Sequence, residues 1–282
     1  LAFEYHAMTH SDQMRYDRQV AWWLIVCAVV IFGMILLGAV TRLTHSGLSI
    51  VEWKPLLGAI PPLNQQDWQV TFQKYQQFPE YQKINRGMSL EDFKTIFMYE
   101  YLHRLLGRLI GVIFAVPLVY FAWRRRLRPG LAPGLVILLF MGGLQVLLGW
   151  YMVKSGLVDI PRVSQYRLTA HLGLAVAIYA GIVWLAFELL FTSGKAAETQ
   201  SKPYARGALG LVALVYVMIL SGGLVAGTRA GLAYPTWPLM GARSSVSEIV
   251  AASSAWLHVG HFMTPQACQV SGRTASPDRQ RR

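Results

Sequence analysis

The chain has 282 residues, of which 54% are hydrophobic and only 14% are charged, and its formal net charge is +12. Soluble globular proteins usually carry about 25% charged residues, so this composition excludes an ordinary soluble domain and is typical of a membrane protein with several spans. The basic residues stand in short clusters between apolar runs rather than along one polar face, which argues against nucleic-acid binding.

Segments of roughly 20 apolar residues are long enough to cross a bilayer as helices. Five segments qualify, and we expect an all-α, polytopic membrane helix bundle with spans at residues 20–41, 103–123, 131–153, 168–192 and 207–228. Basic clusters lie before the first span, after the second, and between the fourth and fifth. Because cytoplasmic loops are enriched in Lys and Arg, we expect residues 1–19 to form a cytoplasmic segment, with the N-terminus inside. The predicted location is a bacterial inner membrane, or the mitochondrial inner membrane in a eukaryote.

The connection at residues 42–99 is then external. It contains Trp53, Asn85 and several prolines, which suit an irregular, partly helical loop resting on the membrane surface. Long loops without secondary structure of their own are uncommon in compact proteins. We therefore expect this loop to form a lid or a wall of a site, with a plain spacer as the alternative.

A repeat relates the first and fifth spans. GAVTRLTHSGLSIVEW at residues 38–53 aligns without gaps to GGLVAGTRAGLAYPTW at residues 222–237. True duplication predicts an N-terminal four-helix bundle at residues 20–194, followed by the first helix and loop of a second, incomplete repeat at residues 207–241. Chance agreement of glycines in apolar segments is the alternative. Residues 242–282 do not continue the pattern, and we expect a disordered tail that results from truncation or an altered reading frame.

Two histidines stand at matched depth in the predicted bundle. His103 and His171 each lie near the external end of a span, on two spans that run in the same direction. Two inward-facing imidazoles at one level would supply both axial ligands of a haem iron. Gly107 and Gly111 continue the face of His103 at four-residue spacing and leave room for a flat macrocycle. The alternatives are that the glycines only pack against another helix and that each histidine only reaches the interface.

Charged residues flank His103 along the chain. Arg104 and Arg108 are candidate anchors for haem propionates, because a guanidinium binds a carboxylate through two hydrogen bonds. Glu100 lies one turn before His103 and could orient its imidazole, take up a proton or stabilise a cationic intermediate; a plain interfacial glutamate is the alternative. Two more arginines at the external level suit either propionates or the membrane interface: Arg42 and Arg167.

These residues occur in motifs that resemble haem A synthase, in particular its mitochondrial and alphaproteobacterial branch. EYLHRLLGRLIG at residues 100–111, TAHLGLA around His171 and AGLAYPTWPLM after the fifth span carry the resemblance, which covers about residues 15–241. It implies two pseudo-symmetric four-helix bundles and the oxidation of a ring methyl group of haem O to the formyl group of haem A, for cytochrome oxidase biogenesis. By the same resemblance, the catalytic residues would be Glu100, His103 and His171, with both histidines as ligands of the substrate iron.

The resemblance also implies a haem B held by a second histidine pair in the C-terminal bundle. After Gly241 nothing resembles the sixth and eighth helices that would carry this pair. His258 and His261 lie on one short segment and cannot replace residues from two separate spans. We therefore expect the haem B site to be missing here and the activity to be impaired.

The expected partners are the lipid bilayer, the substrate haem O, a haem O synthase, an electron donor and a second copy of the chain. The alternative function is a cytochrome b-like electron carrier, in which His103 and His171 hold a permanent haem. A haem-free transporter is disfavoured, because the interiors of the predicted spans contain few ionisable residues.

Overall fold

The computed structural model describes residues 10–52, 58, 60–157, 163–191, 202–228 and 230. The chain divides into two compact units, Leu1–Ala230 and Gly231–Arg282, and all described residues belong to the first. Several predictions fall outside the described residues: those for the tail at 242–282, for the loop after the fifth span, and for His6, His258 and His261.

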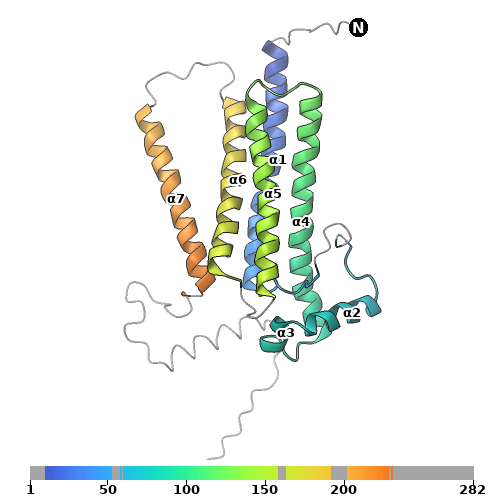
Figure 1. The fold of residues 1–282 in the computed structure, drawn as a ribbon. Coiled ribbons are helices and arrows are strands. Elements are labelled where there is room, and N and C mark those ends of the chain that lie inside the picture. Colours follow the sequence, from blue (N-terminus) through green and yellow to red (C-terminus); the bar gives the residue numbers. More distant parts are fainter. Residues whose placement is uncertain are drawn as a thin grey trace, which may run out of the picture. The chain divides into compact units, whose positions relative to one another are not determined.

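The described residues form seven helices and no strand (Figure 1). Five of them are long and apolar enough to cross a membrane: α1 (His10–Leu43), α4 (Leu90–Trp123), α5 (Leu131–Gly156), α6 (Gln165–Phe191) and α7 (Lys202–Thr228). The predicted all-α bundle with five spans is confirmed. The other two helices, α2 (Gln65–Gln76) and α3 (Pro79–Lys83), lie in the predicted external loop.

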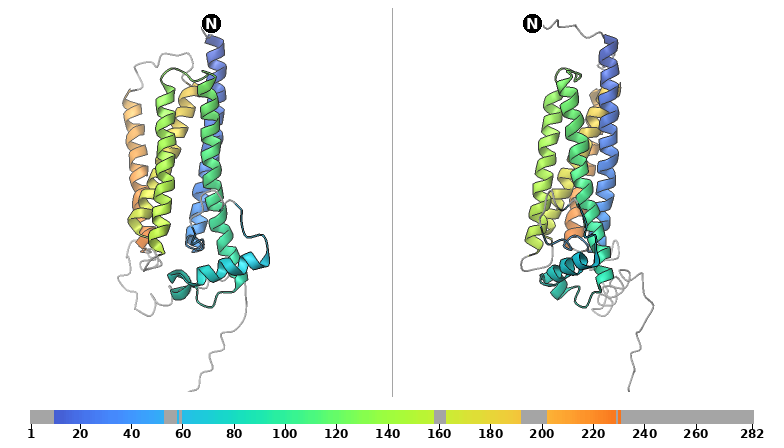
Figure 2. Two further views of the ribbon diagram at one scale, coloured as in Figure 1. Left: turned by 45° about the vertical axis from the view of Figure 1, so that its right-hand side comes forward. Right: turned by 90° about the vertical axis from the view of Figure 1, so that its right-hand side faces the viewer.

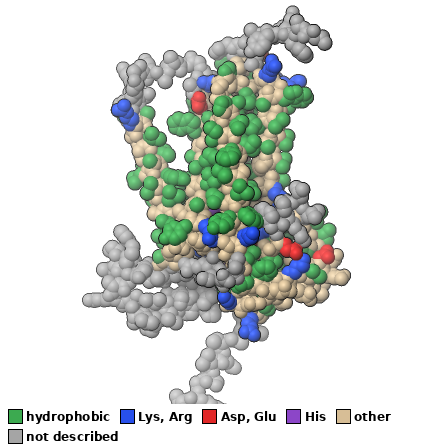
Figure 3. Space-filling model, in the orientation of Figure 1, with side chains coloured by type: hydrophobic (Ala, Val, Ile, Leu, Met, Phe, Trp, Pro, Cys, Tyr) green, Lys and Arg blue, Asp and Glu red, His purple; other side chains and the backbone are tan. Residues whose placement is uncertain are grey.

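Four of the long helices pack into a bundle, in which α1 and α5 each contact both α4 and α6 (Figure 2). Its centre is filled by fully buried aliphatic side chains, among them Leu24, Leu135, Ile182 and Leu189. Hydrophobic side chains also cover the visible outer side of the bundle, and Lys and Arg gather toward its ends (Figure 3). Such an apolar exterior suits contact with lipid.

A buried tryptophan satisfies a backbone carbonyl of α4 that a proline leaves without a donor. Pro117 lies inside this helix and has no N–H, so it cannot bond to the carbonyl of Ile113 one turn earlier. The indole nitrogen Nε1 of Trp23 on α1 donates to this carbonyl over 2.8 Å. The Trp23 ring also packs against Phe114 and Phe121, with ring centroids 5.2 and 5.6 Å apart. The pairing therefore fixes α1 against α4 at this level.

Basic residues meet at the end of the bundle where α1 begins and α4 ends. The guanidinium of Arg126 lies 4.9 Å from the ring centroid of Tyr16 and donates to the hydroxyl of Tyr120 over 2.9 Å. Arg128 lies 4.0 Å from the carboxylate of Glu188 near the end of α6. The arginines before the first span and after the second are thus neighbours in space.

α4 extends well beyond the membrane span that hydropathy predicted, since it begins at Leu90 rather than near residue 103. Ser89 caps it by accepting a hydrogen bond from the backbone N–H of Asp92. The extension packs against α2 and α3 through an aromatic cluster built on four buried residues: Tyr75, Phe93, Phe97 and Tyr101. The predicted external loop is therefore partly helical and rests on the first turns of α4.

α7 packs against α6 through small residues. Gly223 and Gly227 of α7 form a GxxxG pair, which lets helix backbones approach closely. A Cβ atom at Gly227 would lie 2.5 Å from the Cα of Gln165. Tyr216 completes the contact by donating to the carbonyl of Gly173 over 3.1 Å. Most other side chains of α7 are exposed in the described part of the chain, including Leu209, Leu214, Val217 and Met218.

Candidate functional site

Each of the two predicted ligand histidines lies against a glycine of a neighbouring helix. A Cβ atom at Gly38 of α1 would lie 3.2 Å from Nε2 of His103 on α4. A Cβ atom at Gly149 of α5 would lie 3.1 Å from Cε1 of His171 on α6. Both contacts are tighter than a side chain normally makes, so a larger residue at either position would push the imidazole aside.

The two imidazoles lie inside the four-helix bundle, His103 against α1 and His171 against α5, and they interact electrostatically. Both side chains are half-buried. The structure therefore brings together the two residues that the sequence placed at one depth, from α4 and α6.

Two imidazoles alone do not complete the ligand shell of a bare metal ion. The described residues contain no group of three or more His, Cys, Asp or Glu side chains that could hold one. Iron in a haem already has four ligands from the macrocycle and needs only axial ones. The donor set thus suits haem iron. Gly38 leaves room on α1 for the His103 ring, whereas an added Cβ at Gly107 would lie 3.4 Å from Cε of Met34, so Met34 already covers that part of α4.

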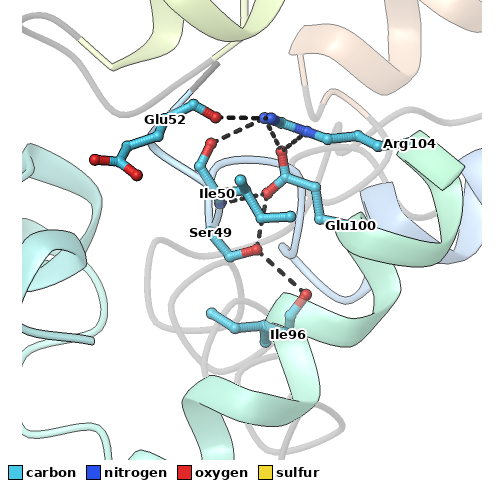
Figure 4. Close-up of polar contacts among 6 residues, drawn as sticks. All are labelled: Ser49, Ile50, Glu52, Ile96, Glu100 and Arg104. Atoms are coloured by element: carbon cyan, nitrogen blue, oxygen red, sulfur yellow. Dashed lines mark hydrogen bonds and ion pairs between the residues drawn. The ribbon is translucent and has the colours of Figure 1, made fainter. Parts of the chain in front are cut away.

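Glu100 lies one turn from His103 and is bound by four hydrogen bonds (Figure 4). Its Oε1 accepts from Arg104 Nη2 over 2.6 Å and from Arg104 Nε over 3.0 Å. Its Oε2 accepts from the hydroxyl of Ser49 over 2.8 Å and from the backbone N–H of Ile50 over 2.7 Å. The Glu100 side chain is only 2% exposed. Four donor atoms, two of them on the cationic guanidinium of Arg104, therefore satisfy both carboxylate oxygens in this buried position.

Arg104 extends the same network to the external segment. Beyond Glu100, its guanidinium donates to the carbonyl oxygens of Ile50 over 2.9 Å and of Glu52 over 3.3 Å (Figure 4). Glu52 in turn forms an ion pair with Lys74 of α2 at 2.7 Å. We call Ser49, Ile50, Glu100 and Arg104 the loop clamp, because they fasten the start of the external loop to α4.

The loop clamp contains two residues with predicted roles at the site, Glu100 and Arg104. The four hydrogen bonds of Glu100 go to Ser49, Ile50 and Arg104, and among the described residues none joins it to His103. Arg104, predicted as a propionate anchor, uses its guanidinium to bind Glu100 and the loop carbonyls. Arg108 lies one turn further along α4, half-buried and beside Tyr101.

The remaining predicted residues have separate positions. Arg42 donates to the carbonyl of Ala226 over 3.1 Å, which ties the end of α1 to the end of α7. Arg167 lies 4.6 Å from the ring centroid of Tyr151. His45 is exposed in the turn after α1.

Sequence reasoning missed the polar and small residues that surround the histidines. It used Gly38 only to detect the repeat, and it did not single out Ser49, Gln145 or Gly149. Gln145 donates through Nε2 to the carbonyl of His171 over 3.0 Å. An amide in an otherwise apolar span is costly, so Gln145 was a signal available in the sequence.

Comparison with known proteins agrees with this geometry. A family model described as a cytochrome oxidase assembly protein (COX15-CtaA) matches residues 21–276. The chain belongs to this family. Its family match continues past residue 241, where the motifs quoted above end.

Curated members of the cytochrome oxidase assembly family are similar to the chain over most of its length. The heme A synthase of Nitrosospira multiformis is 55% identical over 225 residues, which is 79% of this chain and 63% of that protein. The heme A synthase of Parvibaculum lavamentivorans is 48% identical over 237 residues, or 84% of this chain and 68% of that protein. The heme A synthase of Sinorhizobium fredii is 41% identical over 277 residues, or 98% and 74%. The chain thus spans about two thirds of the length of these relatives. No solved structure matches it.

Proposed function

We propose that this chain carries the substrate-binding half of a haem A synthase, which oxidises a ring methyl group of haem O to the formyl group of haem A. The observation that carries the proposal is the pair His103 and His171, which approach each other from α4 and α6, each against a glycine. The heme A synthases among the relatives support the same reaction. The predicted impairment by a missing haem B site remains part of this proposal.

His103 and His171 would bind the two faces of the haem O iron and so fix the position of the macrocycle in the bundle. Gly38 would allow the His103 ring to lie close to α1, and Gly111, with nothing within 4 Å of an added Cβ, would leave room beside α4. Arg108 would pair with a propionate, since it lies on α4 one turn beyond the loop clamp.

Glu100 and Arg104 would act by holding the external loop next to His103. The loop clamp holds the start of the external loop beside the first membrane turn of α4, next to His103. A fixed loop at this point would limit the access of water to the site and hold the carboxylate of Glu100 near the substrate. A negative charge there would stabilise positive charge that develops during oxidation of the methyl group.

We further propose that the protein lies in the inner membrane with its N-terminus inside, where the arginines near Tyr16 and Tyr120 would face the cytoplasm. The external loop and the histidine pair would then face the opposite side. A haem O synthase, an electron donor and a second copy of the chain are the proposed partners.

The test is haem extraction and absorption spectroscopy of the purified protein, its His103→Ala and His171→Ala variants, and an exposed control, His45→Asn. Asn suits the control because His45 has a φ of 54°. We expect haem O or a hydroxylated derivative in the wild type and the control, and loss of the Soret band in both alanine variants. A Soret band that survives in both alanine variants would overturn the proposal.

The same measurement distinguishes the synthase from a cytochrome b-like carrier, which the bis-histidine arrangement also suits. A carrier purifies with stoichiometric haem B that does not exchange. The synthase accumulates haem O, and its haem content changes when haem O is withheld from the cells.

A further inference from the structure

One face of α5 contacts both the backbone and the ring of His171. The side-chain nitrogen of Gln145 donates to the His171 carbonyl over 3.0 Å. One turn later, the imidazole of His171 lies over Gly149, where an added Cβ would be 3.7 Å from Nδ1. Gln145 is therefore next to His171, whose ring turns its Cε1 edge toward Gly149 so that Nδ1 and Nε2 lie almost equally far from the added Cβ, at 3.7 and 3.8 Å.

Two buried atoms at this contact have no hydrogen-bond partner among the described residues. They are Nδ1 of His171 and Oε1 of Gln145. Their chemistry is complementary, because the amide oxygen can only accept and an imidazole whose Nε2 is occupied carries its proton on Nδ1. Burying such a donor or acceptor without a partner is unfavourable.

The composition of α5 also indicates that Gln145 needs a hydrogen-bond partner. From Ala132 to Gly149, Gln145 is the only residue with a polar side chain. Helix packing in a membrane needs small or aliphatic residues, and a buried amide there requires a bonding partner. The His171 carbonyl satisfies the nitrogen of this amide and leaves its oxygen available.

We propose that Gln145 is a positioning residue for His171: its Oε1 accepts the Nδ1–H of His171 when Nε2 binds a haem iron. This inference rests on the proposed function. The hydrogen bond would select the tautomer that leaves Nε2 unprotonated, fix the orientation of the ring, and make Nε2 a more basic ligand.

The experiment titrates haem B, as the probe, into the purified full chain and its variants in detergent, and measures haem affinity and the midpoint reduction potential. Gln145→Leu removes the acceptor and keeps the side-chain size. Gln145→Glu keeps an acceptor oxygen but loses the nitrogen that donates to the His171 carbonyl. Val146→Ala is the control, since Val146 is adjacent and 54% exposed.

For Gln145→Leu we expect haem affinity to fall roughly 10- to 100-fold, in line with the loss of other hydrogen-bond partners of metal-ligating histidines. Its reduction potential should rise, because a less basic imidazole stabilises ferric iron less. Gln145→Glu should retain haem with a potential no higher than that of the wild type, and Val146→Ala should match the wild type.

The inference is overturned if Gln145→Leu behaves like Val146→Ala, or if Gln145→Glu shows the raised potential of Gln145→Leu. The second result would mean that Gln145 acts only through the backbone carbonyl. Failure of the proposed function looks different, because His103→Ala and His171→Ala would then both bind haem as the wild type does.

Discussion

Two groups of polar side chains, the loop clamp and the residues around the histidine pair, differ in how they are bonded. In the loop clamp, the carboxylate of Glu100 and the guanidinium of Arg104 bind partners supplied by the protein itself. Around the histidine pair, buried polar atoms of His171 and Gln145 have no partner among the described residues. A polar network that closes on itself serves the fold, whereas the two atoms beside His171 would complete their hydrogen bond when the histidine binds iron, as proposed above.

The largest effect should come from breaking the closed network. Arg104→Ala leaves the buried carboxylate of Glu100 without its cation and should destabilise the protein by about 3–5 kcal/mol, as for other buried ion pairs. Lys94→Ala is the matched control, because Lys94 pairs with the exposed Glu91 at 2.7 Å, and it should cost at most about 1 kcal/mol. Unfolding by titration with denaturing detergent measures both. Equal effects of the two variants would remove the distinction drawn above.

A side chain added beside His103 should lower haem affinity rather than the stability of the protein. Gly38→Ala places a methyl group 3.2 Å from Nε2 of His103 and should lower haem affinity roughly tenfold by displacing the ligand. Gly33→Ala, on the same helix with nothing within 4 Å of the new Cβ, should leave affinity unchanged. Haem titration followed at the Soret band distinguishes them. The contrast between closed and open regions weakens if both variants bind haem equally well.

The hydrogen bond from Trp23 to the carbonyl of Ile113 offers a second test of a polar contact whose partners both come from the protein. Trp23→Phe leaves the carbonyl of Ile113 without a donor and should cost about 1–3 kcal/mol of stability. In a Pro117→Ala background, the restored backbone N–H can bond to this carbonyl, so the same substitution should cost less. A double-mutant cycle in detergent measures the coupling. Additive effects would show that Pro117 does not create the need for Trp23.

The smallest effect at neutral pH is expected in the aromatic cluster outside the membrane. Burial raises the pKa of Tyr75, although the hydrogen bond from Asn85 opposes this shift. Folding therefore favours the neutral phenol, and its contribution to stability is complete below the usual tyrosine pKa of about 10 and is lost as the pH rises above it. Tyr75→Phe should cost about 1 kcal/mol at pH 7. Its alkaline loss of stability, followed by proteolysis of the external loop, should be shallower than that of the wild type.

Local sequence patterns were sufficient to predict the membrane spans and the family. The described residues of all five predicted spans lie within helices of the structure, because apolar length depends only on neighbouring residues. The start of α4 was missed, since hydropathy falls at the interface while the helix continues for about three turns. The cap at Ser89 and Asp92 could have indicated the true start.

At the site, the sequence determined which residue types are available and at what depth, and so it led to His103 and His171 as a pair. Only the tertiary structure decided which neighbours each side chain meets. Gly38 against His103, Gly149 against His171, and Ser49 and Ile50 on Glu100 all join residues far apart in the chain. The physical reason is that depth follows from counting residues along one helix, whereas hydrogen bonds and close contacts depend on the rotation of one helix against another and on the path of the external loop.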